Sequence, residues 1–185
     1  MKHMKNLTRF GVLLLIISTI FYACQPKTEL VPSPVEVAPY EVSPDAEANL
    51  KIVHEYMDAL LTNDQEKLNS LVGEGFMSYG PARKDSSNIE EIASVWAGIA
   101  KVRSNQDLGV SAMTALRVNE GLFVGDWVHL WGNYTATLND GDYTFDVPWH
   151  SAYFIKDNKI VLTRTWYDSL AIALDLGAVT SVEVK

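Results

Sequence analysis

The last sixty residues constrain the fold most, because they alternate long β-prone runs with short turn sequences. The runs are rich in β-branched and aromatic residues and cover residues 126–137, 143–155 and 160–168. Asn-Asp-Gly-Asp at 139–142 and Lys-Asp-Asn-Lys at 156–159 separate them. Asp-Gly and Asp-Asn favour the tight reversals of β-hairpins. The stretch therefore predicts a meander of long antiparallel strands, followed by a short helix over residues 169–177.

The residues before the meander show helical periodicity. Apolar side chains recur every three or four positions over residues 46–62 and 65–72, and again in a segment that begins near Ser87. Short strands are expected at residues 76–79 and 108–119. Helices segregated in front of an antiparallel meander predict an α+β domain. A helical layer on one face of a curved sheet also predicts a pocket between the two layers.

Residues 1–23 have the pattern of a signal peptide. Three basic residues precede an apolar run over residues 11–23, which is too short to cross a bilayer of about 30 Å. The run ends at Cys24 behind a small residue and resembles a bacterial lipobox, although Phe21 stands where leucine is usual. The resemblance implies lipidation of Cys24 and a tether at the cell envelope, on the outer membrane or cell surface and outside the cytoplasm. An uncleaved anchor and ordinary secretion are the alternatives.

A proline-rich stretch follows the cysteine. Five of the seven prolines lie between residues 25 and 47, and this density favours an extended polyproline II spacer. The expected organisation has four parts. They are the signal peptide over residues 1–23, the lipidated cysteine and linker over 24–45, the folded domain over 46–178 and a tail over 179–185.

The charge balance argues against nucleic-acid binding. The formal net charge is −8, and removal of Lys2, Lys5 and Arg9 with the signal peptide would leave 12 basic and 23 acidic residues, a net charge of −11. Nucleic acids and anionic membrane surfaces both need basic patches, and the sequence has none. The single cysteine excludes an internal disulfide and cysteine metal sites. The histidines lack paired ligand spacing, so no metal or cofactor is expected.

Two stretches resemble a known superfamily. Residues 56–72, Tyr-Met-Asp-Ala-Leu-Leu-Thr-Asn-Asp-Gln-Glu-Lys-Leu-Asn-Ser-Leu-Val, resemble the opening of nuclear transport factor 2-like (NTF2-like) proteins. Residues 157–161, 166–168 and 174–177 resemble the ending of SnoaL-like polyketide cyclases within that superfamily. Together they cover roughly residues 47–177. The resemblance implies a cone-shaped fold with three N-terminal helices packed on a curved antiparallel sheet. The fold carries cyclases, isomerases, dehydratases, hydrolases and binding modules, so it does not fix an activity.

The resemblance also implies three catalytic candidates. Asp168 falls where SnoaL-like cyclases carry an aspartate general base, and the alternative is that it caps the helix that follows it. Tyr56 falls where ketosteroid isomerases carry a tyrosine that donates to the enolate, and the alternative is a core tyrosine. His150 lies near the second donor of those isomerases. Their carboxylate base has no counterpart here, because Gly80 occupies its position.

Further candidates for ligand contact come from strand parity. Three side chains alternate along one strand and share a face: Trp127, His129 and Trp131. They line the pocket if this face is concave, and form a subunit contact if it is convex. Arg164 and Trp166 share a face with Asp168 by the same rule. Arg164 then pairs with Asp168 or with a bound acid, or lies on the surface.

Three functions fit this pattern. The first is a membrane-tethered module that binds a small, largely apolar ligand in the pocket. The second is an acid–base enzyme acting on a carbonyl compound, with Asp168 as the base and Tyr56 or His150 as the donor. The third is a homodimeric scaffold that binds protein through its sheet. The missing carboxylate at Gly80 favours the binding module over the enzyme.

Overall fold

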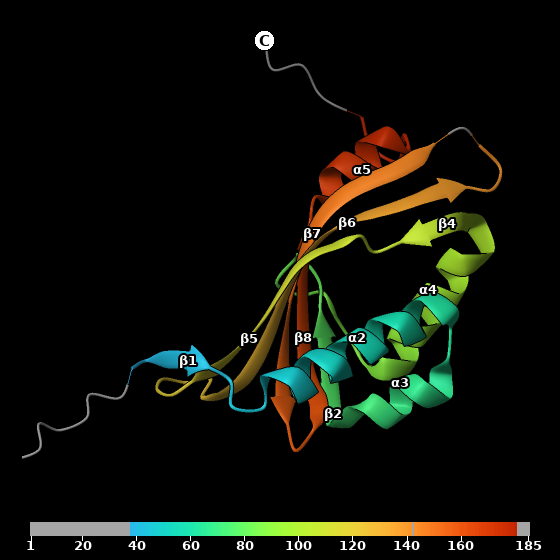
Figure 1. The fold of residues 1–185 in the computed structure, drawn as a ribbon. Helices are drawn as coiled ribbons and strands as arrows, with labels where there is room; N and C mark the ends of the chain where they lie inside the picture. The colour runs from blue at the N-terminus through green and yellow to red at the C-terminus, as the bar shows by residue number, and fades with distance from the viewer. Residues whose placement is uncertain (1–37, 142, 181–185) are drawn as a thin grey trace, which may run out of the picture. The chain divides into compact units, whose positions relative to one another are not determined.

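The helices and strands follow the predicted order closely (Figure 1). The computed structural model describes residues 38–141 and 143–180. All of them belong to one compact unit, Val37–Lys185. Cys24, the predicted signal peptide and most of the predicted linker lie outside the described residues. No helix among the described residues is long and apolar enough to cross a membrane.

The described residues contain four helices and eight strands. The helices are α2 (Ala46–Thr62), α3 (Gln65–Leu71), α4 (Ile89–Val102) and α5 (Ser169–Asp175). The strands are β1 (Tyr40–Val42), β2 (Val72–Tyr79), β3 (Ser86–Ser87), β4 (Arg103–Asp107), β5 (Val110–Val118), β6 (Gly125–Leu138), β7 (Thr144–Lys156) and β8 (Lys159–Tyr167). The three predicted N-terminal helices are confirmed as α2, α3 and α4. The strands β1, β3 and β4 were not predicted.

The strands form one sheet, and that sheet is mixed. Its order is β1-β5-β6-β7-β8-β2-β3, with β4 also paired to β6. The predicted antiparallel meander is confirmed as β6, β7 and β8, and the strand predicted before it is β5, which pairs antiparallel with β6. However, β2 pairs in parallel with β8, which corrects the expectation of a purely antiparallel sheet. A parallel pair needs a long crossover connection, and here α4 and the strands β3 to β7 lie between the two strands in sequence.

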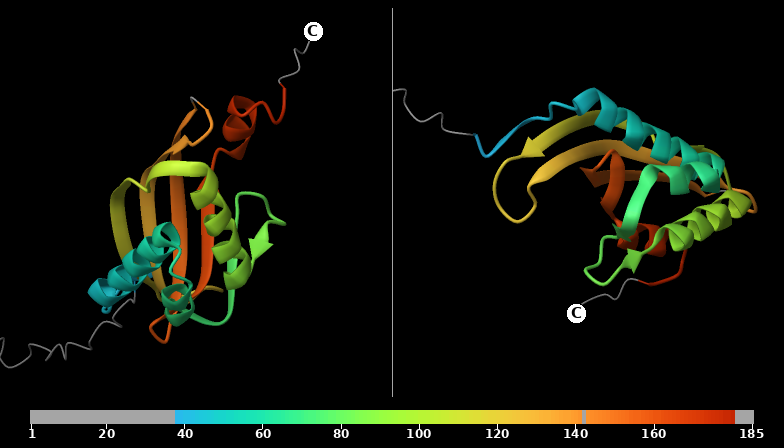
Figure 2. Two further views of the ribbon diagram at one scale, coloured as in Figure 1. Left: turned by 90° about the vertical axis from the view of Figure 1, so that its right-hand side faces the viewer. Right: turned by 90° about the horizontal axis from the view of Figure 1, so that it is seen from below.

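The helices and the sheet form two layers. Figure 2 shows α2, α3 and α4 against the concave face, or inner face, of the curved sheet. The convex side is called the outer face. A capping box begins α4: the Asn88 Oδ1 accepts from the Glu91 N–H at 2.9 Å, and the Glu91 Oε2 accepts from the Asn88 N–H at 2.9 Å. At the other end of the sheet, α5 lies by β6 and β7 (Figure 1).

Two hydrophobic clusters lie over the inner face. The larger joins α2 and α3 to the middle strands, and the smaller consists of Ala136, Phe145 and Val147 with Ile172 of α5 against it. Gly132 makes room for a large side chain on this face. A Cβ there would lie 2.7 Å from the indole ring of Trp149, whose Nε1–H donates to the Leu108 carbonyl at 2.9 Å. The absence of a side chain at Gly132 lets the indole lie across β6.

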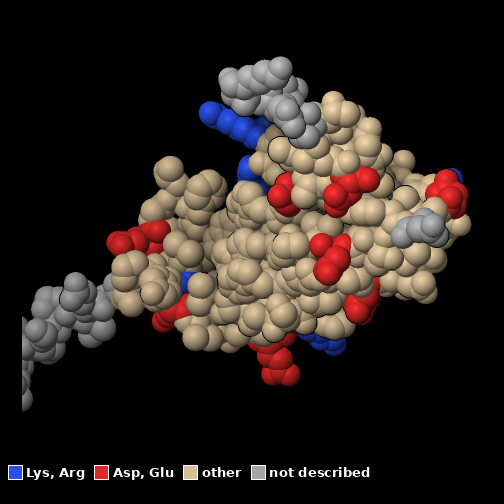
Figure 3. Space-filling view, turned by 90° about the horizontal axis from the view of Figure 1, so that it is seen from above, with Lys and Arg blue, Asp and Glu red and all other residues tan. Residues whose placement is uncertain are grey.

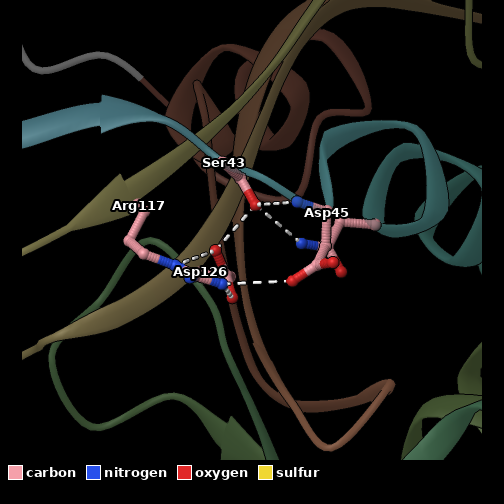
Figure 4. A network of polar contacts seen from close by, with 5 residues as sticks. Ser43, Asp45, Arg117 and Asp126 are labelled. Atoms are coloured by element: carbon pink, nitrogen blue, oxygen red, sulfur yellow. Dashed lines mark hydrogen bonds and ion pairs between the residues drawn. The ribbon is translucent and has the colours of Figure 1, made fainter.

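The last residues of the predicted linker belong to the folded domain. Strand β1 pairs with β5, and Ser43, which follows β1, is only 3% exposed. The Ser43 hydroxyl donates to the Asp126 Oδ1 at 2.7 Å and accepts from the Asn49 Nδ2 at 3.2 Å (Figure 4). Arg117 donates to both oxygens of Asp126, at 3.0 and 2.6 Å. Strand β1 and Ser43, which fall in the stretch expected to be linker, therefore pack with the folded domain.

Candidate functional site

A cavity of about 560 Å³ lies between the inner face of the sheet and the helices α2 and α4. Most of its lining is apolar. The apolar side chains include Met57 and Leu60 from α2, Ile92, Val95, Trp96 and Ile99 from α4, Phe145, Val147 and Trp149 from β7, and Ile172 from α5. Both hydrophobic clusters and α5 therefore contribute to its wall.

Hydroxyl groups form a polar strip in this lining, on the inner face of β7, β8 and β2. The Ser151 Oγ and the Thr165 Oγ1 are 2.6 Å apart, and the Thr163 Oγ1 donates to the Ser78 Oγ at 2.9 Å. Ser151 and Thr163 are 2% and 3% exposed. The hydroxyls satisfy one another, which offsets the cost of burying them. Each hydroxyl oxygen keeps a lone pair that a ligand can use.

Two buried tyrosines also line the cavity. Tyr56 is 3% exposed and packs against Phe76 and Tyr153, with ring centroids 6.1 and 6.0 Å away. Burial raises the pKa of the Tyr56 hydroxyl, and burial raises the pKa of Tyr153 to about 12. Both hydroxyls stay protonated at neutral pH and can serve as hydrogen-bond donors. Tyr56 is thus a core tyrosine that also lines the cavity, so both alternatives from the sequence apply to it. Its role as a catalytic donor stays a prediction.

Arg103 is a cavity residue that the sequence analysis missed. It follows α4 directly, and its guanidinium carbon lies 3.8 Å from the ring centroid of Phe145 and 5.8 Å from that of Tyr134. Its Nη1 is 3.4 Å from the Tyr134 hydroxyl. The apolar stripe of α4 was a usable signal, because Ile92, Trp96 and Ile99 lie on one helical face that position 103 continues.

Asp85 is the only carboxylate among the described residues that line the cavity. A Cβ built on Gly80 would lie 3.2 Å from the Asp85 Oδ2. The Asp85 carboxylate therefore lies beside Gly80, the residue that occupies the position of the isomerases' base. Asp85 is exposed, and its Oδ2 accepts from the Ala82 N–H at 3.1 Å. It lies at the rim and is held by its own loop.

Asp168 does not line the cavity, although its neighbours Tyr167 and Ser169 do. It is exposed and is the N-cap residue of α5, where its Oδ1 accepts from the Ala171 N–H at 2.8 Å. This is the capping geometry that the sequence offered as the alternative to catalysis. Of the three catalytic candidates, only Tyr56 faces the cavity, so the structure does not bring the three together.

The other predicted ligand contacts lie on the outer face. Val128 and Leu130 of β6 are fully buried on the inner face, so the alternating residues Trp127, His129 and Trp131 point outward. His150 stacks between two indoles, with ring centroids 4.9 Å from Trp131 and 5.3 Å from Trp166. Of the two alternatives that strand parity left open for this face, the structure has the convex one, so these side chains do not line the cavity.

The two histidines of this outer face contact each other. The His129 Nδ1 lies 3.2 Å from the His150 Nε2, and the rings are nearly parallel at 5.4 Å. Burial lowers the pKa of His129, and the nearby charge of His150 lowers it further; burial also lowers the pKa of His150. Both rings are therefore mostly neutral at pH 7, and one can donate to the other.

Arg164 also lies on the outer face. Its guanidinium carbon is 4.8 Å from the ring centroid of Tyr79 and 5.9 Å from that of Trp166. Among the described residues, no ion pair joins Arg164 to Asp168. Arg164 is thus a surface cation stacked on aromatic rings.

The charges on the face shown in Figure 3 are mostly negative. Acidic side chains are spread over it, and few basic ones lie beside them.

In the part of the chain that the structure describes, no three His, Cys, Asp or Glu side chains lie close enough to hold a metal ion.

Comparisons with known proteins give matches by fold. No protein-family model matches the chain, and no curated protein matches its sequence. A protein provisionally named a SnoaL-like polyketide cyclase, from Jannaschia sp. CCS1, is 18% identical with a TM-score of 0.61 over 76% of this chain and 99% of that one. An NTF2-like protein from Burkholderia xenovorans LB400 is 18% identical with a TM-score of 0.54 over 69% of this chain and 95% of that one.

A third structure widens the range of activities. An LEH-like epoxide hydrolase from M. tuberculosis is 13% identical, with a TM-score of 0.52 over 72% of this chain and 99% of its own. Identities this low establish the fold alone. The domain therefore has the NTF2-like fold, and its structural neighbours include SnoaL-like polyketide cyclases, as the two sequence stretches predicted.

Proposed function

We propose that the protein is a lipid-anchored component of the bacterial cell envelope whose domain binds a small, largely apolar molecule. The cavity is the observation that carries the proposal. Its volume of about 560 Å³ lies within the range of small-molecule sites, roughly 300–1,000 Å³. Its aromatic and aliphatic wall suits an apolar body, and the hydroxyl strip supplies a few polar contacts.

Binding is favoured over catalysis by the chemistry of the cavity lining. Catalysis next to a carbonyl needs a base within hydrogen-bond reach of the substrate. Tyr56 and Tyr153 are protonated at neutral pH, and the only lining carboxylate among the described residues, Asp85, is exposed at the rim. An enzyme would have to use Asp85 as its base and Tyr56 as its donor. Loss of turnover with retained binding in Asp85→Asn, on any substrate found, would favour that alternative.

A fluorescence titration tests the binding proposal. The neutral probe N-phenyl-1-naphthylamine is added to the purified domain, and its emission rises when it enters an apolar site. We expect Ile99→Trp, which fills the cavity from α4, to weaken binding at least about tenfold, or 1.4 kcal/mol. Ser94→Trp is the matched control, because Ser94 is exposed on the same helix and outside the lining. Equal affinities in both variants would contradict the proposal.

The envelope location rests on the sequence of the first 24 residues. We expect Cys24→Ser to abolish labelling with a fatty acid and to release the protein from the membrane fraction. Retention of the label and of membrane partitioning in this variant would contradict the lipid anchor.

Self-association through the outer face is a second candidate function. Trp131 and Trp166 are 43% and 42% exposed, and their indole rings stack on either side of the His150 ring. Exposed aromatic groups of this kind are typical of protein contacts. A homodimer built on this face should dissociate in Trp131→Ala in a sedimentation velocity experiment. Sedimentation of the wild type as a monomer at high concentration would contradict this candidate.

A further inference from the structure

The cavity contains a positive charge whose hydrogen bonding is incomplete. Arg103 lines the cavity wall, and its Nε is buried without a hydrogen-bond partner among the described residues. Its Nη1 reaches only the Tyr134 hydroxyl, at the long distance of 3.4 Å, and that hydroxyl itself donates to Gln106 at 2.9 Å. A buried donor without a partner is costly, so the guanidinium is poised to take an acceptor.

No carboxylate neutralises this guanidinium in the described part of the chain. None of the ion pairs among the described residues includes Arg103, whereas Arg117 contacts the carboxylates of both Asp45 and Asp126. Asp85 precedes α4 and Arg103 follows it, so the two lie about 20 Å apart at opposite ends of this helix. Asp175 near this end of the cavity accepts from the Tyr143 hydroxyl at 2.8 Å instead.

The surroundings explain how the charge is held without an anion. The faces of Phe145 and Tyr134 attract the guanidinium through cation–π contacts. Arg103 is also the C-cap residue of α4, where the carbonyl end of the helix favours a cation. These interactions fix the side chain beside the cavity and leave its Nε unused.

We infer that the ligand of this cavity carries an anionic group, a carboxylate, sulfonate or phosphate, that binds Arg103 while its apolar body lies against α4. The inference rests on the proposed function and names the ligand class of the same site. Guanidinium forks match the planar geometry of a carboxylate and can offer Nε and one Nη together. The hydrogen bonds of such a pair are charge-assisted and partly shielded from water, so they should dominate selectivity among apolar molecules.

Two probes that share one skeleton test the inference. N-Phenyl-1-naphthylamine is neutral, and 8-anilinonaphthalene-1-sulfonate is the same molecule with one sulfonate. We expect the wild type to bind the sulfonate at least about tenfold more tightly. We expect Arg103→Met to remove this preference and to leave the affinity for the neutral probe within about twofold. Arg164→Met is the matched control, because Arg164 also stacks on aromatic rings but lies on the outer face.

Competition on the wild type makes the test independent of the folding of any variant. Dodecanoate and 1-dodecanol have equal chain lengths, and we expect dodecanoate to displace the neutral probe at about tenfold lower concentration. Equal binding of the neutral and anionic molecules would overturn the inference and leave the proposed function standing. Failure of both probes to bind would overturn the proposed function and the inference with it. A preference for the sulfonate that persists in Arg103→Met would assign the anion site to another residue.

Discussion

The two faces of the sheet differ in what their polar groups do. On the inner face, the hydroxyls of Ser151 and Thr163 are buried and paired, and helices cover the strands around a cavity. On the outer face, stacked indole and imidazole rings stand exposed around His150. Both faces are rich in aromatic residues, so aromatic content does not identify the binding side. Coverage by helices identifies it, because the helices and the concave face enclose a volume that the uncovered convex face cannot.

The largest expected difference between the faces is in folding stability. Phe145 on the inner face is fully buried, so Phe145→Ala should lower the free energy of unfolding by about 3–5 kcal/mol. Trp166 on the outer face is 42% exposed, and Trp166→Ala should cost about 1 kcal/mol or less. Urea denaturation of both variants gives the comparison. Equal losses would contradict the assignment of the two faces.

A smaller effect is expected where β1 and α2 are tied to the sheet. The hydrogen bond from Arg117 holds the pKa of Asp126 below its usual range, and the hydrogen bond from Ser43 acts in the same direction. Asp126→Asn should lower the free energy of unfolding at pH 7 by about 1–2 kcal/mol. Because the folded pKa is depressed, this stability is present above the unfolded pKa of about 3.9 and is lost as the pH falls through the folded value.

Denaturation of the wild type and Asp126→Asn along a pH series measures this effect. The difference between the two proteins should shrink in acid. A difference that stays constant down to pH 3 would contradict the role of the ionised carboxylate.

The smallest effect concerns the histidine pair of the outer face. The pKa values of His129 and His150 are lowered, so the folded protein binds protons less readily than the unfolded chain does. Stability should therefore be complete above the unfolded pKa of about 6.5 and should fall as the pH drops below it. The double variant His129→Gln, His150→Gln should flatten this part of the thermal stability profile. His54→Gln, at an exposed site on α2, should leave the slope in place.

Most of the fold could be predicted from the sequence because the periodic spacing of apolar residues within each segment indicates whether it is a helix or a strand. The meander and the three N-terminal helices follow from spacing and turn residues alone. Strand β1 was missed because it has only three residues and is flanked by Pro39 and Pro44, which suggest a linker. Its assignment depends on pairing with β5, a contact between residues more than seventy positions apart.

The site was less predictable because strand parity groups side chains without saying which face is covered. The outer residues of β6 are more aromatic than the inner Val128 and Leu130, so composition could not decide which face lines the cavity. The prediction of Asp168 as a helix boundary was correct, but as the N-cap its carboxylate accepts from the Ala171 N–H of α5 and does not enter the cavity. Arg103 was missed because an arginine after a helix is usually a surface residue, although its position continues the apolar stripe of α4 that lines the cavity.

The indole N–H signals in a heteronuclear NMR spectrum test the central claim most directly. The chain has five tryptophans: Trp96 and Trp149 line the cavity, and Trp127, Trp131 and Trp166 lie on the outer face. Substitution of each by phenylalanine assigns the signals. Titration with N-phenyl-1-naphthylamine should shift the two cavity signals and leave the three outer ones in place. Shifts confined to the outer three would contradict a ligand site on the inner face.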